Sequence, residues 1–119
     1  MQKLKSSEIA LLRQQILLEQ QGLCALCNEP IEEGKAVLDH CHTTGQIRGV
    51  LHRGCNAFEG NIVNAMPRNL ITLERLHNIL ARLMWYHSQL KPLLHPTHRT
   101  PEQKAQRAKK RAQAKRKKK

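Results

Sequence analysis

Residues 38–56 read LDHCHTTGQIRGVLHRGCN and hold three histidines, two cysteines, one aspartate and one asparagine. Thiolates, imidazoles and carboxylates are the side chains with which proteins bind metal ions. A closed zinc site needs about four ligands, so this stretch has more metal-seeking side chains than one ion requires. We therefore ask whether these residues divide between two tasks.

The composition of the chain predicts a weak apolar core that needs additional stabilisation, for example by a bound metal ion. The chain has 119 residues and only one Phe, one Trp and one Tyr, and a small core without aromatic side chains is marginal. No run of about 18 apolar residues occurs, and residues 1–10 lack an apolar signal core, so we expect a soluble, cytoplasmic protein. In a reducing compartment, four cysteines indicate metal ligands more than two disulfides.

The sequence predicts an α+β fold. Ile9, Leu12 and Ile16 recur at three- and four-residue spacing and indicate an amphipathic helix, with Ser6 or Ser7 as its cap and a stop at Gly22. The elements expected after it are an irregular β-hairpin over residues 35–51 that turns at Gly45, a short helix over 55–66 ended by Pro67, and a longer helix reaching about Leu90.

The charge of the chain is concentrated at its C-terminal end. The net charge is +12, and the segment from residue 102 onward holds ten Lys or Arg against one Glu, a net of +9 that leaves +3 for the rest. This tail has no apolar face, so we expect it to be disordered when free. We divide the chain into a zinc-stapled domain at 1–66, a long amphipathic helix for packing or dimerisation at 67–91, and a Pro-containing linker with the tail at 92–119.

Four side chains match the spacing of a structural zinc site. Cys24 and Cys27 are separated by two residues, which lets both thiolates reach one ion from a single turn. His52 and Cys55 have the same spacing and start 25 residues after Cys27. The alternative fourth ligand is Cys41, which lies in a predicted strand away from any such pair.

A second set remains: Asp39, His40, His42 and Asn56. Asp39 and Asn56 offer hard oxygen atoms, which suit magnesium or manganese better than zinc. His40 can take a proton from water, since imidazole titrates near neutral pH. Together these are the parts of a one-metal phosphodiesterase. In the alternative interpretation, Asp39 and Asn56 cap turns and the histidines are ordinary surface residues.

The order of these motifs is familiar. A Cys-x-x-Cys pair, then LDHCHTTGQIRGVL at 38–51, then a second pair ending in CNAFEG at 55–60 resembles the phage recombination endonuclease VII family, a branch of the His-Me finger (HNH-like, ββα-metal) nucleases. The resemblance covers roughly residues 10–62. It implies a ββα-metal finger with structural zinc on Cys24, Cys27, His52 and Cys55. The family usually has cysteine where this chain has His52, from which we expect altered zinc affinity and no loss of the site.

The resemblance also implies catalytic roles. His40 would be the general base, Asp39 and Asn56 would hold the catalytic divalent ion, His42 would contact the scissile phosphate, and Glu59 would lie near the metal. The expected activity is hydrolysis of DNA phosphodiester bonds, with preference for branched substrates such as Holliday junctions, in the cytoplasm of a bacterial host. A non-selective nicking enzyme and a catalytically inactive nucleic-acid-binding module are the alternatives.

Two further partner predictions concern the C-terminal half. The basic tail is expected to contact DNA phosphates; a purely solubilising tail is the alternative, and a membrane partner is not expected because the tail has no apolar face. A leucine stripe at alternating three- and four-residue steps predicts a helix that packs along another helix. Either the first helix covers the stripe within a monomer, or a homodimer forms through residues 70–90. The stripe consists of Leu73, Leu76, Leu80, Leu83 and Leu90.

Overall fold

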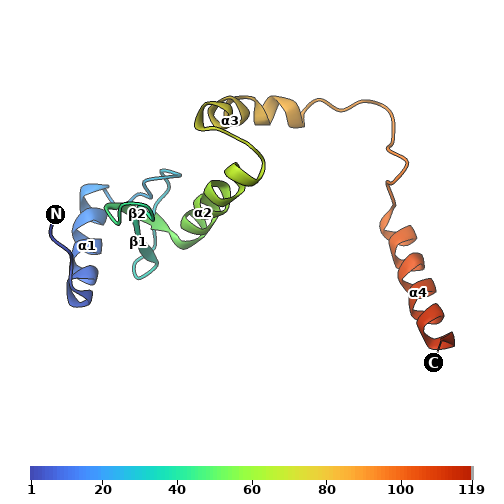
Figure 1. The fold of residues 1–119 in the computed structure, drawn as a ribbon, viewed down its shortest axis with the longest axis horizontal. Coiled ribbons are helices and arrows are strands. Elements are labelled where there is room, and N and C mark those ends of the chain that lie inside the picture. Colours follow the sequence, from blue (N-terminus) through green and yellow to red (C-terminus); the bar gives the residue numbers. More distant parts are fainter. Residues whose placement is uncertain (119) are drawn as a thin grey trace. The chain divides into compact units, whose positions relative to one another are not determined.

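The computed structural model describes residues 1–118, and in them four α-helices accompany one two-stranded sheet (Figure 1). The chain divides into two compact units, Met1–Ile79 and Leu80–Lys119. The α+β class predicted from the sequence is confirmed. The elements in chain order are a 3-10 turn at Ser6–Glu8, α1 at Ile9–Glu19, β1 at Ala36–His40, β2 at Ile47–His52, α2 at Arg53–Arg68, α3 at Leu73–His87 and α4 at Pro101–Lys117.

Helix α1 forms where the apolar spacing predicts it and stops at the predicted glycine. Gly22 has a φ of 78°, and its backbone N–H donates to the Leu17 carbonyl at 2.9 Å, which satisfies one of the last carbonyls of the helix. The start differs from the prediction, because neither serine caps α1. Its N-cap is Glu8, whose carboxylate accepts from the Lys5 backbone N–H at 3.0 Å.

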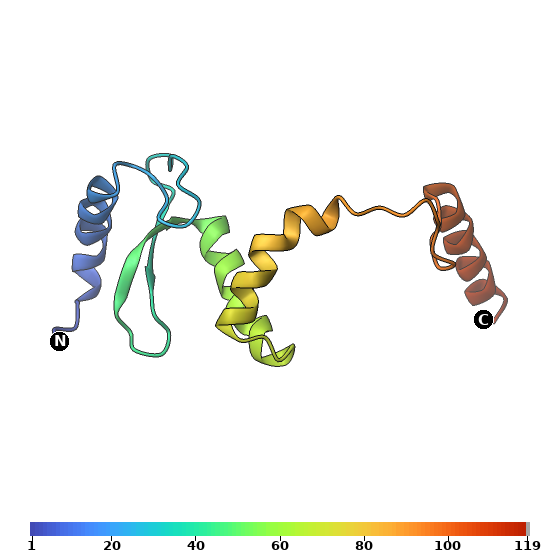
Figure 2. The same ribbon diagram turned by 90° about the horizontal axis from the view of Figure 1, so that it is seen from above.

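Strands β1 and β2 form an antiparallel hairpin, as predicted, and Gly45 in its turn has a φ of 80°. The hairpin lies between α1 and α2 (Figure 2), and both helices contact both strands. The pairing is irregular at one place: Asp39 is opposite Gly49, whereas His40 is opposite Ile47. Arg48 is therefore an extra residue on β2, which makes a β-bulge next to the end of β1.

The buried apolar core of this unit is small. Cys24, Ile31, Val50 and Leu51 are its buried members. One polar side chain locks the core to α1: the Gln20 amide donates to the Leu23 and Val50 carbonyls at 2.8 and 2.9 Å and accepts from the Val50 N–H at 2.9 Å. The Gln20 side chain thus makes the hydrogen bonds to the Val50 backbone that a neighbouring strand would otherwise make. So small an apolar core agrees with the expectation that the fold needs a metal.

Helix α2 is longer than predicted, because Pro67 lies inside its last turn and the helix ends at Arg68. After the C-cap Asn69, two more backbone N–H groups close the helix: Leu70 donates to the Pro67 carbonyl at 3.2 Å and Ile71 to the Met66 carbonyl at 2.8 Å. Leu70 adopts a φ of 55° there, a position that usually takes glycine. The separate helix α3 begins only at Leu73, so the single element predicted over 67–91 is shorter than expected.

The C-terminal tail corrects one prediction: it is a helix and not a disordered segment. Thr100 caps α4 by accepting from the Gln103 backbone N–H at 3.2 Å, and the Gln103 side chain accepts in return from the Thr100 N–H at 2.9 Å. Pro101 occupies the first helical position, which suits its fixed φ. Ala, Lys, Arg and Gln are strong helix formers, and this propensity outweighs the charge of the segment. Within residues 1–118, no helix is both long and apolar enough to cross a membrane.

Candidate functional site

The first cysteine pair lies in a tight turn stabilised by backbone hydrogen bonds. The Cys24 N–H donates to the Glu29 carbonyl at 2.8 Å, and the Asn28 N–H donates to the Cys24 carbonyl at 2.9 Å. The Leu26 N–H donates to the Cys24 sulfur at 3.4 Å. A backbone donor on a thiolate favours its charged form, so this turn is built to hold a metal ligand.

The second pair joins the first at the boundary between strand and helix. His52 is the last residue of β2 and Cys55 is in the first turn of α2. The ligand atoms of Cys24, Cys27, His52 and Cys55 all lie within 4.8 Å of one another. Ligands of a tetrahedral zinc stand about 3.5–3.8 Å apart, given bond lengths of about 2.0–2.3 Å, so small side-chain adjustments suffice for one zinc ion.

The orientation of His52 identifies its ligand atom. Its Nδ1 lies 3.3 Å from the Cys27 sulfur and 3.7 Å from the Cys55 sulfur. On the other side of the ring, Nε2 is 2.9 Å from the Pro30 carbonyl. A zinc-binding histidine commonly donates its second N–H to such an acceptor. His52 therefore faces the cluster with Nδ1, and Cys41 is not a member of it.

The pKa values of the thiols show what the cluster requires. Burial acts to raise the pKa of Cys24, but hydrogen bonds from the backbone of Cys27, His52 and Leu26 outweigh it and lower the pKa to about 6. Burial and the neighbouring thiols raise the pKa of Cys55 to about 11. Without a cation these sulfurs cannot all be thiolates near neutral pH. A zinc ion would supply the positive charge that lets the three thiols ionise, while His52 would bind it as a neutral imidazole.

An arginine that the sequence did not single out contacts three of the predicted site residues, His40 only through its backbone carbonyl. The Arg48 guanidinium donates from Nε to Asp39 Oδ2 at 2.9 Å and from Nη2 to Asp39 Oδ1 at 3.5 Å. Its Nη2 also lies 3.5 Å from Glu59 Oε1 and donates to the His40 carbonyl at 3.2 Å. The hydrogen bond to Asp39 is the main cause that raises the pKa of Arg48. The Arg48 side chain thus links its own strand β2 to β1 and to α2.

These charged groups line a cleft of about 300 Å³. The Asp39 side chain is only 8% exposed, while the Arg48 side chain is 44% exposed and the Glu59 side chain 23%. The lining residues are Ala25, Leu26, Asp39, Arg48, Gly49, Leu51 and Glu59. Two carboxylates from different elements therefore face one solvent-accessible space that already attracts positive charge.

The two histidines lie at the end of β1 and just after it. The rings of His40 and His42 stack with their centroids 4.7 Å apart, and both residues are exposed to solvent. Asn56 lies in the first turn of α2, next to Cys55. Within residues 1–118, no hydrogen bond joins Asn56 to Asp39, and Asp39, His40 and Glu59 form no second metal cluster like that of the cysteines.

Arg48 was missed because its position depends on the strand register. As an ordinary strand residue it would alternate with its neighbours, and nothing in the sequence IRGVLH marks a bulge. The one available signal is a basic residue within ten positions of an otherwise unpaired aspartate. That signal is weak, because arginines are common in exposed strands.

Two comparisons with known proteins bear on this geometry. A comparison with curated proteins finds no match to the chain. A family model described as recombination endonuclease VII matches residues 2–85. The match spans most of the chain, contains the Cys/His cluster and the cleft, and confirms the resemblance seen in the sequence. The chain therefore belongs to the recombination endonuclease VII family, a family of nucleases whose partner is DNA.

Proposed function

We propose that the protein is a metal-dependent endonuclease that hydrolyses DNA phosphodiester bonds at branched sites such as Holliday junctions. The observation that carries the proposal is the cleft in which Asp39 and Glu59 both contact Arg48. His40, the residue after Asp39, contacts the same guanidinium through its backbone carbonyl, and its side chain is exposed. An enzyme of this kind needs a cation, a base and an open approach for the backbone of DNA. The cleft offers carboxylates for the cation and an open approach, and we assign the base to His40 at the end of β1.

The donor set of the cleft fits magnesium or manganese. The carboxylates of Asp39 and Glu59 are hard oxygen donors, and the Arg48 guanidinium lies within 3.5 Å of both. We assign Asp39 and Asn56 as ligands of the divalent ion and place Glu59 near it. When bound, such an ion polarises the scissile phosphate and stabilises the leaving oxygen.

His40 transfers the proton, and His42 helps to position the phosphate. His40, on the last residue of β1, takes the proton from the attacking water through its exposed ring. His42 stacks against that ring, which restricts its rotation, and we assign to His42 a contact with the scissile phosphate. Arg48 holds β1 against α2 through Asp39 and Glu59. It is therefore a positioning residue for the carboxylates.

The proposed zinc site stabilises the arrangement of Asp39 and Glu59. We propose that Cys24, Cys27, His52 and Cys55 hold one structural zinc ion per chain. His52 ends β2 and Cys55 begins α2, so the ion fixes the angle at which the helix leaves the hairpin. Because Asp39 is on the hairpin and Glu59 is on the helix, that angle sets the distance between the carboxylates.

We further propose a homodimer formed through residues 70–90. Along α3, Leu73 is 77% exposed, Leu80 is 54% exposed and Leu83 is 40% exposed. Leu76 is half-buried and Leu90, beyond the end of α3, is 86% exposed, so four of the five leucines are exposed in the described chain, and a second copy can bury them by helix-to-helix packing. Two copies related by a two-fold axis present two active sites in opposed orientation, as symmetric cutting of a junction requires. Light scattering coupled to size exclusion measures the mass, and Leu76→Glu with Leu83→Glu should give the monomer.

A direct comparison of substrates tests the proposed selectivity. Purified protein is incubated with a four-way junction and with a linear duplex of the same sequence, in magnesium and in EDTA. The proposal expects magnesium-dependent cleavage that is faster on the junction. Equal rates on both substrates by a monomeric protein would favour the non-selective nickase. No cleavage of either substrate would leave only a DNA-binding role.

We also propose that the basic tail contacts DNA phosphates and that the protein acts in the cytoplasm of a bacterial host.

A further inference from the structure

Helix α4 carries a large charge that the described chain does not neutralise. Its only acidic residue is Glu102 in the first turn. All side chains of α4 are exposed, and none of the ion pairs within residues 1–118 involves a residue of this helix. Cations without internal partners call for an anion from outside the chain.

The cations of α4 are unevenly arranged around the helix. Lys104, Arg107, Arg111 and Lys115 follow one another at steps of three and four residues, so they lie on one face. We call these four residues the cationic stripe. The remaining cations of the helix are Lys109, Lys110, Arg116 and Lys117, which lie on the other faces and are called the off-stripe cations.

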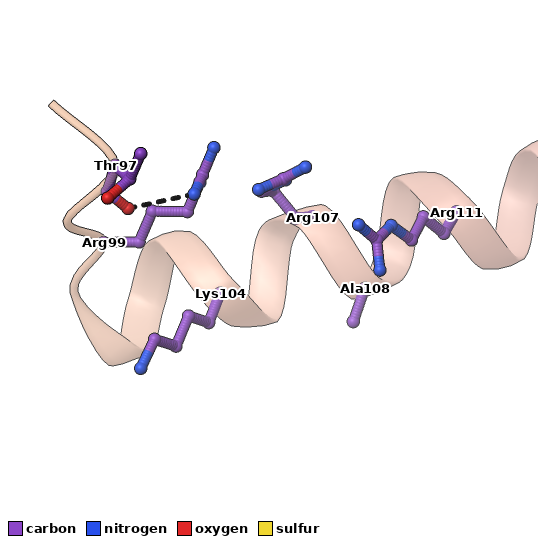
Figure 3. Close-up of a pocket in the computed structure, with 6 residues that line it drawn as sticks. All are labelled: Thr97, Arg99, Lys104, Arg107, Ala108 and Arg111. Carbon is purple, nitrogen blue, oxygen red and sulfur yellow. Dashed lines mark hydrogen bonds between the residues drawn. The ribbon is translucent and has the colours of Figure 1, made fainter. Parts of the chain in front are cut away.

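The stripe begins at a hollow formed by α4 and the residues before it. Arg99 precedes the helix, and its Nη1 donates to the Thr97 carbonyl at 3.0 Å, which holds the guanidinium in place. Figure 3 shows Arg99 beside the first turns of α4, on the same side as Arg107, with Arg111 further along the helix. The hollow has a volume of about 320 Å³, and its lining contains Lys104 and these three arginines but no acidic residue.

We propose that α4 binds the sugar-phosphate backbone of duplex DNA as a helix, through the cationic stripe, with the hollow at Arg99 taking the first phosphate. This inference rests on the proposed function, because it takes DNA as the partner. The stripe spans about 17 Å, since eleven residues rise about 1.5 Å each. Phosphates of one strand follow every 3.4 Å or so along the duplex axis, so the stripe reaches about five of them.

The charge pattern also weakens the helix, and an anionic partner would remove that cost. Arg107 and Arg111, and then Arg111 and Lys115, are like charges four residues apart that repel each other on the helix surface. An isolated helix of this length is marginal in water. Phosphates placed along the stripe turn that repulsion into attraction, so DNA stabilises α4 in the conformation seen here.

Two other partners fit the helix less well. A membrane-surface helix needs large apolar side chains opposite its charges, whereas the apolar residues of α4 are alanines and one proline. An acidic protein would pair its carboxylates with individual cations and would have no reason to prefer a regular stripe. A continuous polyanion with evenly spaced charges matches the stripe best.

Two charge-matched variants test the proposal. The stripe variant carries Lys104→Gln, Arg107→Gln, Arg111→Gln and Lys115→Gln. The off-stripe variant carries Lys109→Gln, Lys110→Gln, Arg116→Gln and Lys117→Gln. Both lose four positive charges and keep good helix formers. Binding of the full chain to a short fluorescent duplex is measured by anisotropy in EDTA, at several salt concentrations.

The stripe variant should bind more weakly and lose about 3.6 from the slope of log affinity against log salt, at about 0.9 for each lost phosphate contact. The off-stripe variant should lose less than about 1 from the same slope. A third variant, Ala108→Pro, keeps every charge and interrupts the helix, so it should also flatten the slope. Circular dichroism of the wild type should show added helix when the duplex is present.

Equal slope losses in the two charge-matched variants, or an unchanged slope with Ala108→Pro, would overturn the proposal and leave α4 as a flexible polycation. Wild-type protein that does not bind the duplex would overturn it as well. Because binding is measured in EDTA, these results do not depend on cleavage. A wild type that binds through the stripe yet never cuts DNA in magnesium would contradict the proposed nuclease function alone.

Discussion

Replacing Gln20 by methionine should destabilise the unit that contains the Cys/His cluster, because the Gln20 amide makes three hydrogen bonds to backbone groups of Leu23 and Val50. Methionine keeps the length of the side chain and removes both the donor and the acceptor. Gln20 also lies against Gly49, where an added Cβ would come within 3.1 Å of its Oε1. Since Gly49 lines the cleft, the change also loosens one wall of the proposed active site.

The size of the stability loss depends on which backbone groups are left without a hydrogen-bond partner. Val50 is fully buried, and its N–H donates to Gln20 Oε1, so this donor would be left without an acceptor. The Val50 carbonyl keeps the Ala25 N–H at 3.1 Å, and the half-buried Leu23 carbonyl can turn to water. A buried polar group left unpaired costs about 1–3 kcal/mol. We expect a loss of about 2 kcal/mol in the free energy of unfolding.

Thermal unfolding of the zinc-loaded protein measures this loss. For a unit of this size, about 2 kcal/mol lowers the melting temperature by roughly 8–16 °C. Gln15→Met is the matched control, since Gln15 is an exposed residue of α1, the helix that Gln20 caps, and it should stay within about 0.5 kcal/mol of wild type. If both variants melt at the same temperature, the Gln20 amide does not hold α1 to β2.

Three further predictions concern the metals and a helix end. Cys24→Ser should lose zinc and largely unfold the finger, because structural zinc contributes on the order of 10 kcal/mol in small domains, while metal analysis of Cys41→Ser should still find one zinc per chain. Asn56→Ala should raise the magnesium concentration for half-maximal cleavage without abolishing cleavage; an unchanged midpoint would remove Asn56 from the metal site. Leu70→Gly should raise the free energy of unfolding by about 0.5–1 kcal/mol, since the backbone there has a φ of 55°, and a lower melting temperature would contradict that reading.

The features that the sequence predicted well depend on local spacing. The Cys-x-x-Cys pair fits a single turn whatever surrounds it, and His52 and Cys55 repeat that spacing. The three- and four-residue recurrence of apolar side chains predicted α1, and Gly45 marked the hairpin turn. In each case the residues that decide the structure are within a few positions of one another.

The features that it missed depend on pairing between distant residues. The bulge at Arg48 is a property of the register between β1 and β2, and a register cannot be read from either strand alone. The Gln20 amide replaces a neighbouring strand for Val50, thirty positions away. A single polar residue carries no periodic signal that could have revealed this role.

The conformation of the tail was missed for a different reason. Its composition gives two opposing signals, since a run of like charges favours disorder whereas Ala, Lys, Arg and Gln favour helix. The Thr100 capping box and Pro101 decide in favour of the helix. Both are visible in the sequence as a threonine, a proline and a glutamine at the right spacing, and giving them more weight would have predicted α4.

We propose that DNA is cut at the cleft beside the Cys/His cluster, with His40 as the base. The most direct test of this claim is the rate at which supercoiled plasmid is nicked, measured in magnesium and in EDTA for wild type and for His40→Ala. We predict cleavage by the wild type only in magnesium, and a rate at least about 100-fold lower for His40→Ala, the effect typical of losing a general base, with zinc content and DNA binding unchanged. Wild-type rates from the His40 variant, or no cleavage by the wild type in magnesium, would contradict the claim.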